Sequence, residues 1–582
     1  MSKETKFLSI AIGLLQGFNK ENGVADKAAY SMDAEKLYKF VEYAWENCVD
    51  QKKKRSNEVD YPAGNDRNRF HQNGIVKGEK HLGSIFIETR SGGIGTPAQV
   101  KFFKLLPGED AGDFDRVNGK ITMIRDITGF DGCLSRKLPV GRYVIEVSKG
   151  SEYEIITDDI EIKEDTNSRK SYDLSRFVNM EEMGWIAGEL HHHSVYSSPV
   201  FGGDDDVVDT PQEIANSQMA MGLSYGALSD HHIILSHPAW KALKRHNFVP
   251  IISKEISTSN GHVMAMGVPI DVIYKIPEDK DRTDEYLRNE FVRITDVIKE
   301  NGGLAQINHP RDLQRSISWN PNFNDMLDIF ETMEIWNGSN PMMPGSTNDA
   351  AMKLWMDCMK RGLFLPATTG SDTHNICADD YHILFDEVMD VLDAIKANAT
   401  TLLKEYPEET HVMLEIGDKL LPLLEKWAET CLSSGCVRTY INFDASMPRE
   451  DTHNPEYIMD RLRRGRSFLT NGPILVSRVN GKLPGHKVPV STGGRKKGKT
   501  GDCGAELEIE LMILANRGLK TLKLCTENGV YKDIPLKGGK KNGFYDYSQT
   551  IKEPVPDGNY LYFMVQDDCT NLAITNPVIL VR

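Results

Sequence analysis

Histidines and carboxylates recur where short apolar runs end between residues 184 and 378. The stretch "GELHHHSVYSSP", residues 188–199, places three adjacent histidines directly after one such run. Four later runs, "LSYGALSDHH", "FVPIISKEIST", "GGLAQINHP" and "LFLPATTGSDTH", also carry or end in His, Asp or Glu. One such residue would say little, whereas recurrence at five strand ends predicts a metal site. The predicted ligands are His191, His193, His231, Glu255, His262, His309, Asp372 and His374.

The spacing within two of these motifs fits ligation of a single ion. Residues i and i+2 of a strand point to the same side, roughly 6.5 Å apart, so His191 and His193 can bind together. Asp372 and His374 repeat that arrangement. His192 should face the opposite side, where packing or a supporting hydrogen bond is its expected role.

The types of donor atom indicate the chemistry. All are nitrogen or oxygen, with no thiolate, which suits zinc, manganese or iron without choosing among them. Eight ligands exceed the number that one tetrahedral ion uses. With Glu255 as a bridge, we predict two divalent ions about 3.5–4 Å apart. Such a pair lowers the pKa of bound water and stabilises charge on the leaving group, so the predicted chemistry is hydrolysis.

Alternating strands and helices must position these ligands. Thr210 and Pro211 begin one helix, with a cap and a proline at its first position. The stretches "RTDEYLRNEFVRITDVIKENGG" and "TNDAAMKLWMDCMKRG" predict two more. This alternation predicts βαβ units and a parallel sheet, as a barrel or an open α/β fold. In a parallel barrel the carboxyl ends of all strands meet at one face, which would bring the ligands together.

The motifs together resemble a known family. "LHHHSVYSS", "ALSDHH", "KEIST…GHVMAMGV", "NHP" and "GSDTH" are similar, in order and spacing over about 190 residues, to the motifs of the PHP (polymerase and histidinol phosphatase) superfamily. "GRYVIEVSKGSEYE…GW" and "RLRRGRSFLTNGPILVSRVNGKLPG" resemble its CehA/McbA-type branch. The resemblance implies a metal-dependent hydrolase on a distorted seven-stranded β/α barrel with flanking β domains.

Carried over by position, the resemblance divides the ligands between two ions. It implies that one ion is held by His191, His193, Glu255 and Asp372. It implies that the second is held by Glu255, His262 and His309, with Asp230, His231 and His374 completing the site or holding a third ion. The chain departs from the family pattern at Ser198, where the family commonly has an acidic residue. We therefore predict two ions and leave the third open, with Asp204–Asp206 as a substitute ligand or a solvated acidic run.

Three residues are candidates for steps beyond metal binding. Asp230 and His231 could act as acid or base, which only the geometry of the site can decide. Arg311, two residues after His309, could clamp an anionic substrate or form a surface salt bridge. Only Lys254 and Arg311 bring positive charge close to the ligands in sequence, which favours a neutral or weakly anionic ester.

The rest of the chain divides into four parts. Residues 1–60 read as a helical segment, followed by a polar linker. Residues 80–178 carry short alternating segments typical of a small β-sandwich-like domain. Residues 184–475 form the metal-binding barrel, with a helical insertion at about 380–430. Residues 476–582 return to short strands and predict a C-terminal β domain.

Composition limits the choice of partner and compartment. The 69 basic and 84 acidic residues give a net charge of −15, so nucleic acid is not expected as a partner. No apolar run is long enough to span a membrane. Nine scattered cysteines fit a reducing compartment, and we expect a cytoplasmic protein. The short apolar N-terminus leaves an exported form open, and the oligomeric state is also left open.

The predicted function is hydrolysis of a small-molecule ester, either a phosphoester or a carboxylic or carbamic ester. The alternative is a non-catalytic, metal-stabilised scaffold whose β domains recognise glycan or protein; a nuclease is disfavoured by the acidic charge. "GGRKKGKT", residues 493–500, matches the P-loop pattern. It lacks the preceding strand and following helix that phosphate binding requires, so we read it as a basic β-loop.

Overall fold

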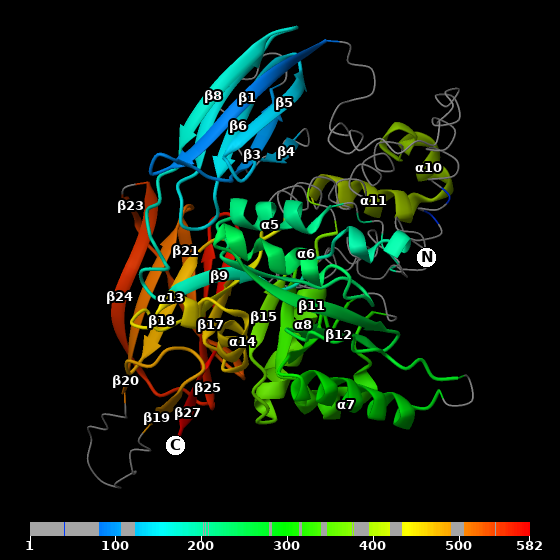
Figure 1. Ribbon diagram of the computed structural model, residues 1–582, viewed down its shortest axis with the longest axis vertical. Coiled ribbons are helices and arrows are strands. Elements are labelled where there is room, and N and C mark those ends of the chain that lie inside the picture. The colour runs from blue at the N-terminus through cyan, green and yellow to red at the C-terminus, as the bar shows by residue number, and fades with distance from the viewer. Residues whose placement is uncertain are drawn as a thin grey trace.

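The computed structural model describes most of the chain from residue 81 onward. The described residues are 40, 43, 81–105, 123–201, 203, 205, 207, 209–278, 282–312, 317–338, 346–374, 376, 395–419, 434–490, 506–541 and 543–582. The predicted N-terminal helix, apart from residues 40 and 43, and the P-loop-like stretch lie outside these ranges. The described part is a mixed α/β protein with three groups of strands (Figure 1).

The predicted ligands lie in or shortly after six of seven consecutive strands. The strands hydrogen-bond to one another in chain order, and the first also pairs with a later strand, β16 (Arg438–Asn442). An isolated parallel bridge between His192 and Thr373 joins the chain just beyond the first and last of the seven. The seven strands are β9 (Trp185–Glu189), β10 (Tyr225–Leu228), β11 (Val249–Thr258), β12 (Gly261–Met266), β13 (Leu304–Asn308), β14 (Thr332–Asn337) and β15 (Ala367–Gly370).

One strand departs from the parallel arrangement that the sequence predicts. β12 is antiparallel to both of its neighbours, β11 and β13. Only two residues separate β11 from β12, and a connection that short permits a hairpin but no parallel crossover. The hairpin therefore returns His262 beside the ligand-bearing part of β11, where it pairs with Ser257.

Helices connect and cover these strands, and three of them form where the sequence predicts helices. Thr210 caps the first through a reciprocal bond with Glu213, Thr283 caps the helix over residues 284–300, and Ser346 caps the one over residues 347–360. The helices are α5 (Pro211–Ala220), α6 (His237–Lys241), α7 (Asp284–Glu300) and α8 (Thr347–Lys360). Short 3₁₀ segments are η5 (Val195–Ser197), η6 (Pro199–Phe201), η7 (Ala242–His246) and η9 (Pro321–Ile329). Beyond β15, the described part of the predicted insertion forms α10 (Ala399–Glu405) and α11 (Pro407–Lys419).

The N-terminal β region consists of two four-stranded sheets packed on a shared core. Alternate residues of β1 are buried, and Ile85, Ile87, Phe102 and Ile145 meet between the sheets. One sheet contains β1 (Leu82–Ser91), β2 (Ile94–Gly95), β5 (Cys133–Pro139) and β8 (Asn167–Asp173). The other contains β3 (Gln99–Lys104), β4 (Met123–Ile127), β6 (Gly141–Ser148) and β7 (Ile156–Ile162).

The C-terminal strands continue the sheet that carries the ligands. β16 pairs with β9 on one side and with β17 (Ser467–Thr470) on the other, and β17 pairs with β26 (Leu572–Thr575). β25 (Tyr560–Asp567), β21 (Leu519–Thr526) and β22 (Gly529–Pro535) extend the sheet. β27 (Val578–Val581) pairs with β25, and β19 (Lys487–Pro489) pairs with β27. A second sheet contains β18 (Ile474–Val479), β20 (Glu506–Ala515), β23 (Gly539–Lys541) and β24 (Phe544–Pro554). Helices α13 (Arg449–Thr452) and α14 (Pro455–Arg463) lie between β16 and β17 in sequence. Strands from both sides of the predicted boundary at residue 475 therefore belong to the same main sheet.

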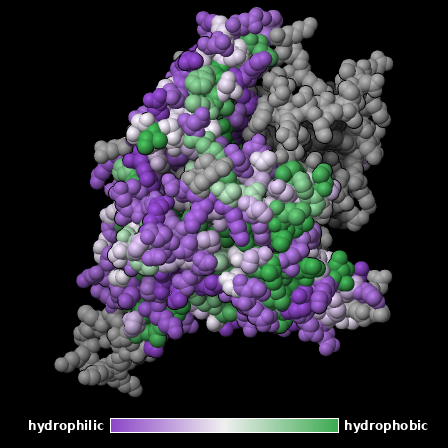
Figure 2. Space-filling view, in the orientation of Figure 1, coloured by the Kyte–Doolittle hydropathy of each residue, from purple (hydrophilic) through white to green (hydrophobic). Residues whose placement is uncertain are grey.

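The face shown in Figure 2 is mostly hydrophilic, with hydrophobic residues gathered over the region of β12. Ile270, Ile273 and Ile276, in the segment that follows β12, are exposed. Among the described residues, no helix combines the length and apolar character that crossing a bilayer requires.

Candidate metal centre

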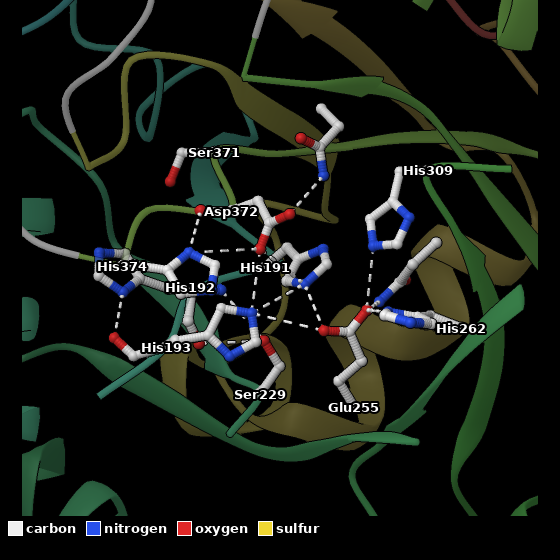
Figure 3. A network of polar contacts seen from close by, with 12 residues as sticks. His191, His192, His193, Ser229, Glu255, His262, His309, Ser371, Asp372 and His374 are labelled. Atoms are coloured by element: carbon white, nitrogen blue, oxygen red, sulfur yellow. Dashed lines mark hydrogen bonds and ion pairs between the residues drawn. The ribbon is translucent and has the colours of Figure 1, made fainter. Parts of the chain in front are cut away.

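Four predicted ligands converge on one small buried volume (Figure 3). His191 Nε2 lies 3.1 Å from Glu255 Oε2, 3.2 Å from Asp372 Oδ1 and 3.2 Å from His193 Nε2. His193 Nε2 lies 3.0 Å from the same Asp372 oxygen and 3.4 Å from the same Glu255 oxygen. An ion bound tetrahedrally at about 2.0–2.2 Å spaces its donor atoms roughly 3.3–3.6 Å apart. The four atoms therefore stand close to the spacing that such an ion requires.

The other oxygen of Glu255 faces a second set of donors. Glu255 Oε1 lies 3.1 Å from His262 Nδ1 and 3.2 Å from His309 Nε2, and it accepts a hydrogen bond of 2.8 Å from Asn308 Nδ2. His231 Nδ1 lies 3.4 Å from Glu255 Oε2. Since its two oxygens point at different groups of histidines, Glu255 has the geometry of a bridging ligand.

A third group lies on the far side of His193. Asp205 Oδ2 is 3.1 Å from His231 Nε2 and 3.3 Å from His374 Nε2. The ring of His193 stacks on those of both histidines, at centroid distances of 4.3 Å and 4.4 Å. Asp205 belongs to the acidic run that the sequence offers as a substitute for Ser198. Its carboxylate reaches the group because the loop folds back, with Asp205 N donating to Ser197 O.

Strand ends and a hairpin bring these side chains together. His191 and His193 follow β9, His231 follows β10, and the chain that follows β15 carries Asp372 and His374. Glu255 lies within β11, His262 within β12, and His309 directly after β13. Because β12 pairs His262 with Asn308, the antiparallel strand aligns one ligand with the residue that precedes another.

Two of the predicted ligands have unusual backbone conformations. His309 has φ of 22° and Asp372 has φ of 54°, a region that residues with a Cβ rarely adopt. The Asp372 conformation is held by hydrogen bonds, since its N donates to His191 O and His193 N donates to Thr373 O. Strain that the surrounding structure maintains is typical of functional sites.

The charges within the centre shift the pKa values of its carboxylates downward. Burial opposes ionisation of Glu255, but the charges of His191, His262 and His231 outweigh it and hold its pKa well below the usual range. The pKa of Asp372 is lowered in the same way, chiefly by His191 against its own burial. Both carboxylates are therefore ionised at neutral pH, as a ligand for a cation must be.

The histidines divide into two classes. Burial opposes protonation of His309, but the hydrogen bond that its ring donates to Glu255 outweighs it and raises the pKa to about 9. Asp205 raises the pKa of His374 to about 9 against the same opposition. Burial, together with the charges of His231 and His374, lowers the pKa of His193 to about 3. His309 and His374 thus hold protons at neutral pH, and a cation that binds at their nitrogens would displace these protons.

Three residues singled out in the sequence lie elsewhere. His192 turns away from the four donors, as expected, and its Nδ1 pairs with His193 O at 2.9 Å. Asp230 accepts hydrogen bonds from Ser194 N, Ser194 Oγ and Ser197 Oγ at 2.7–3.0 Å. Arg311 donates to Pro310 O, Trp319 O and Asn324 Oδ1. Neither Asp230 nor Arg311 belongs to the described groups of converging donors.

Three polar residues at the centre were not predicted from the sequence. Glu334 lies 3.1 Å from His191 Nδ1, Asn337 Nδ2 donates to Asp372 Oδ2 at 3.2 Å, and Ser257 Oγ lies 2.6 Å from His231 Nδ1. One signal was available for Glu334. It is a carboxylate within the apolar strand "TMEIW", and a charged residue in such a strand is rarely buried without a partner.

Comparisons with known proteins add little to this geometry. No family model matches the chain, and no curated protein matches it. A candidate metal-dependent phosphoesterase from Bifidobacterium adolescentis is similar at 14% identity, covering 36% of this chain and 96% of its own, with a TM-score of 0.24. An amidohydrolase from Chromobacterium violaceum is similar at 18% identity, covering 32% and 87%, with a TM-score of 0.22. At these TM-scores the likenesses define neither the fold nor the activity of this chain.

Proposed function

We propose that the protein is a metal-dependent hydrolase that acts on a small-molecule ester. The observation that carries the proposal is the placement of Glu255, whose two oxygens face two separate groups of histidines at 3.1–3.2 Å. Buried imidazoles and carboxylates at this spacing suit zinc, manganese or iron. The proposal assigns two ions, one beside each carboxylate oxygen of Glu255. The group around Asp205 is left as an additional site.

The residues of the chain divide the work at such a centre. When bound, a pair of divalent ions supplies an activated water and neutralises negative charge that develops on an attacked ester. His191, His193 and Asp372 would hold one ion with Glu255, and His262 and His309 would hold the other. The histidines and Glu255 are buried, whereas the side chain of Asp372 is 23% exposed, so solvent reaches the centre beside Asp372.

Proton transfer is assigned to His231 rather than to Asp230. Both nitrogens of His231 are engaged, with Ser257 Oγ at 2.6 Å and Asp205 Oδ2 at 3.1 Å, so its ring is held at the edge of the centre. Asp230 is committed to the serines of the loop after β9, and His231 N donates to one of them, Ser197 Oγ. Asp230 therefore serves to fix that loop against His231.

The two cations closest to the ligands in sequence support an uncharged ester as substrate. Lys254 Nζ pairs with Asp271 at 2.5 Å, and the guanidinium of Arg311 donates to main-chain and amide oxygens. Neither is oriented as a phosphate clamp would be. This favours a carboxylic or carbamic ester over a phosphomonoester.

The proposed fold family is the PHP type. Seven hydrogen-bonded strands, the bridge between His192 and Thr373, and ligands at successive strand ends are what a distorted seven-stranded barrel of this type would contain. The flanking β strands fit the CehA/McbA-type branch that the motifs resemble.

Metal content is the first test of the proposal. The protein is purified without chelator and its bound metals are measured by elemental analysis, beside His191→Ala and a control, His81→Ala, whose ring pairs with Glu164 in the N-terminal β region. We expect about two equivalents of zinc, manganese or iron, fewer in His191→Ala and an unchanged number in the control. The loaded protein is then assayed on carboxylic, carbamic and phosphate esters.

Two results would contradict the proposal. Absence of metal after reconstitution at neutral pH would remove the centre itself. Full occupancy without turnover of any ester class would favour a metal-stabilised binding scaffold.

A further inference from the structure

Glu334 is a buried carboxylate that contacts two predicted ligands without facing the convergence of donor atoms. It lies within β14 and is fully buried. Its oxygens lie 3.1 Å and 3.3 Å from His191 Nδ1. One of them, Oε2, also accepts hydrogen bonds from His309 N at 2.8 Å and from Asn337 Nδ2 at 3.2 Å.

The contact with His191 fixes which nitrogen of that ring faces the centre. Nδ1 meets the carboxylate of Glu334, whereas Nε2 points toward the proposed metal-binding oxygens of Glu255 and Asp372, 3.1 Å and 3.2 Å away. With a cation bound at Nε2, the ring would keep its proton on Nδ1 and donate it to Glu334. A carboxylate behind a ligating imidazole selects the tautomer and orients the ring.

The contact with His309 supports a strained backbone. His309 has φ of 22°, and its N–H donates to Glu334 Oε2. A conformation of this kind persists only when surrounding bonds hold it. His309 faces the other oxygen of Glu255, so Glu334 connects the two groups of donors from behind.

A bulge in β14 allows Glu334 and Asn337 to act together. In a regular strand, residues three apart point to opposite faces. Pairing with β15 shifts by one residue between Glu334 and Trp336, and such a shift re-aims the side chains that follow it. Asn337 thereby reaches both Glu334 and Asp372, at 3.2 Å each.

We propose that Glu334 is a positioning residue that holds one histidine of each metal group in its ligating orientation. The inference rests on the proposed metal centre. It assigns to Glu334 a task distinct from ligation, although its carboxylate lies close enough to His191 and His309 to form a donor group of its own.

Glu334→Gln tests this role because glutamine keeps the shape of the side chain. Three N–H donors, from His191, His309 and Asn337, face the two oxygens of Glu334, and an amide offers only one oxygen. One donor would therefore meet an NH₂ group. The matched control is Glu331→Gln, which loses a carboxylate beside the same strand, where Glu331 pairs with Arg463 at 2.9 Å and accepts from Ala305 N.

Zn²⁺ binding by the metal-depleted full chain, measured by calorimetry, is the readout. We expect Glu334→Gln to keep the number of sites found in the wild type, with affinity weakened about 10–100-fold. We expect Glu331→Gln to match the wild type. Substitution with Co²⁺ adds a spectroscopic test, since the visible spectrum reports ligand geometry at full occupancy, and we expect it to change only in Glu334→Gln.

The outcomes separate the inference from the function on which it rests. Loss of one whole equivalent in Glu334→Gln would make Glu334 a ligand and overturn its positioning role. Unchanged affinity and an unchanged Co²⁺ spectrum would overturn it as well. A wild type that binds no Zn²⁺ would instead refute the proposed metal centre.

Discussion

At the scale of single residues, the centre depends on one carboxylate more than on any histidine. Glu255 is 1% exposed and lies within 3.4 Å of donor nitrogens on five histidines. Its Oε2 faces His191, and its Oε1 faces His262 and His309. A substitution there should disturb both groups at once, whereas a substitution of one histidine should disturb mainly its own group.

We predict that Glu255→Gln lowers bound metal from about two equivalents to below one. The amide removes the negative charge and leaves a single acceptor for two groups of nitrogens. Activity on the best ester should fall by about 10²–10³-fold or more. Elemental analysis and kcat/KM measure these effects.

The control for Glu255→Gln is Glu290→Gln. Glu290 is also buried, but it pairs with Arg293 on α7, outside the centre. Equal metal loss in both variants would mean that Glu255 acts only through general stability.

At the scale of elements, the ends of β9 and β15 approach so closely that one position must lack a side chain. A Cβ added at Gly370, the last residue of β15, would overlap the Cβ of His191 and Oε1 of Glu334. Asp372 follows two residues later with its positive φ. The contact between these strand ends therefore sets where His191 and Asp372 stand relative to each other.

We predict that Gly370→Ala destabilises the fold by about 1–3 kcal/mol through overpacking. Its metal affinity should fall as well, because the displaced groups are a predicted ligand and its partner. Urea unfolding and Zn²⁺ calorimetry measure the two effects. In the control, Gly539→Ala, the new methyl group meets no described atom within 4 Å, and both quantities should stay at wild-type values.

How much of this centre the sequence predicts depends on the kind of element. Ligands at strand ends are predictable, because an apolar run that stops at His or Asp marks both the strand and its end. The pairing of Glu334 with Asn337 was not, since the bulge in β14 changes which face each residue joins. The sequence did not single out Asp205 from its acidic neighbours, Asp204 and Asp206. A loop that folds back has no hydrophobic periodicity that would show which side chain points toward the centre. The β12 hairpin was readable from its short turn, yet the surrounding alternation of strands and helices favoured a parallel strand.

At the scale of the whole molecule, buried polar contacts join the N-terminal β region to the ligand-bearing part. Lys149 is 8% exposed, and its Nζ donates to Pro97 O and to Met219 O of α5, both at 2.7 Å. Beside it, Tyr440 of β16 donates to Glu152, which also pairs with Arg176. Both β16 and α5 adjoin the strands that carry the ligands.

This junction should make stability depend on pH. Burial, with a contribution from Arg176 and against Glu152, lowers the pKa of Lys149 to about 7 from 10.5. Between these values the unfolded chain holds a proton that the folded chain lacks, so the free energy of unfolding rises with pH. Below pH 7 both states are protonated, and the cost of the buried charge is fully present.

We predict that, between pH 8 and pH 9, the free energy of unfolding of the wild type rises by up to about 1 kcal/mol more than that of Lys149→Met. Urea unfolding of both proteins at the two pH values gives the difference. Parallel curves for the two proteins would show that Lys149 stays charged in the folded state.

The continuous sheet also affects how the protein is made. β9, which leads into His191 and His193, pairs with β16 on one side. β16 in turn pairs with β17, and β17 pairs with β26, which begins about 390 residues after β9 begins. At about 5–20 residues per second, a ribosome needs roughly 20–80 s to synthesise that length. The first histidines therefore leave the ribosome long before the strands that brace them exist. If the centre binds metal as proposed, the chain in which these strands have formed would acquire it, and the cation supply met after synthesis would determine which ion it carries.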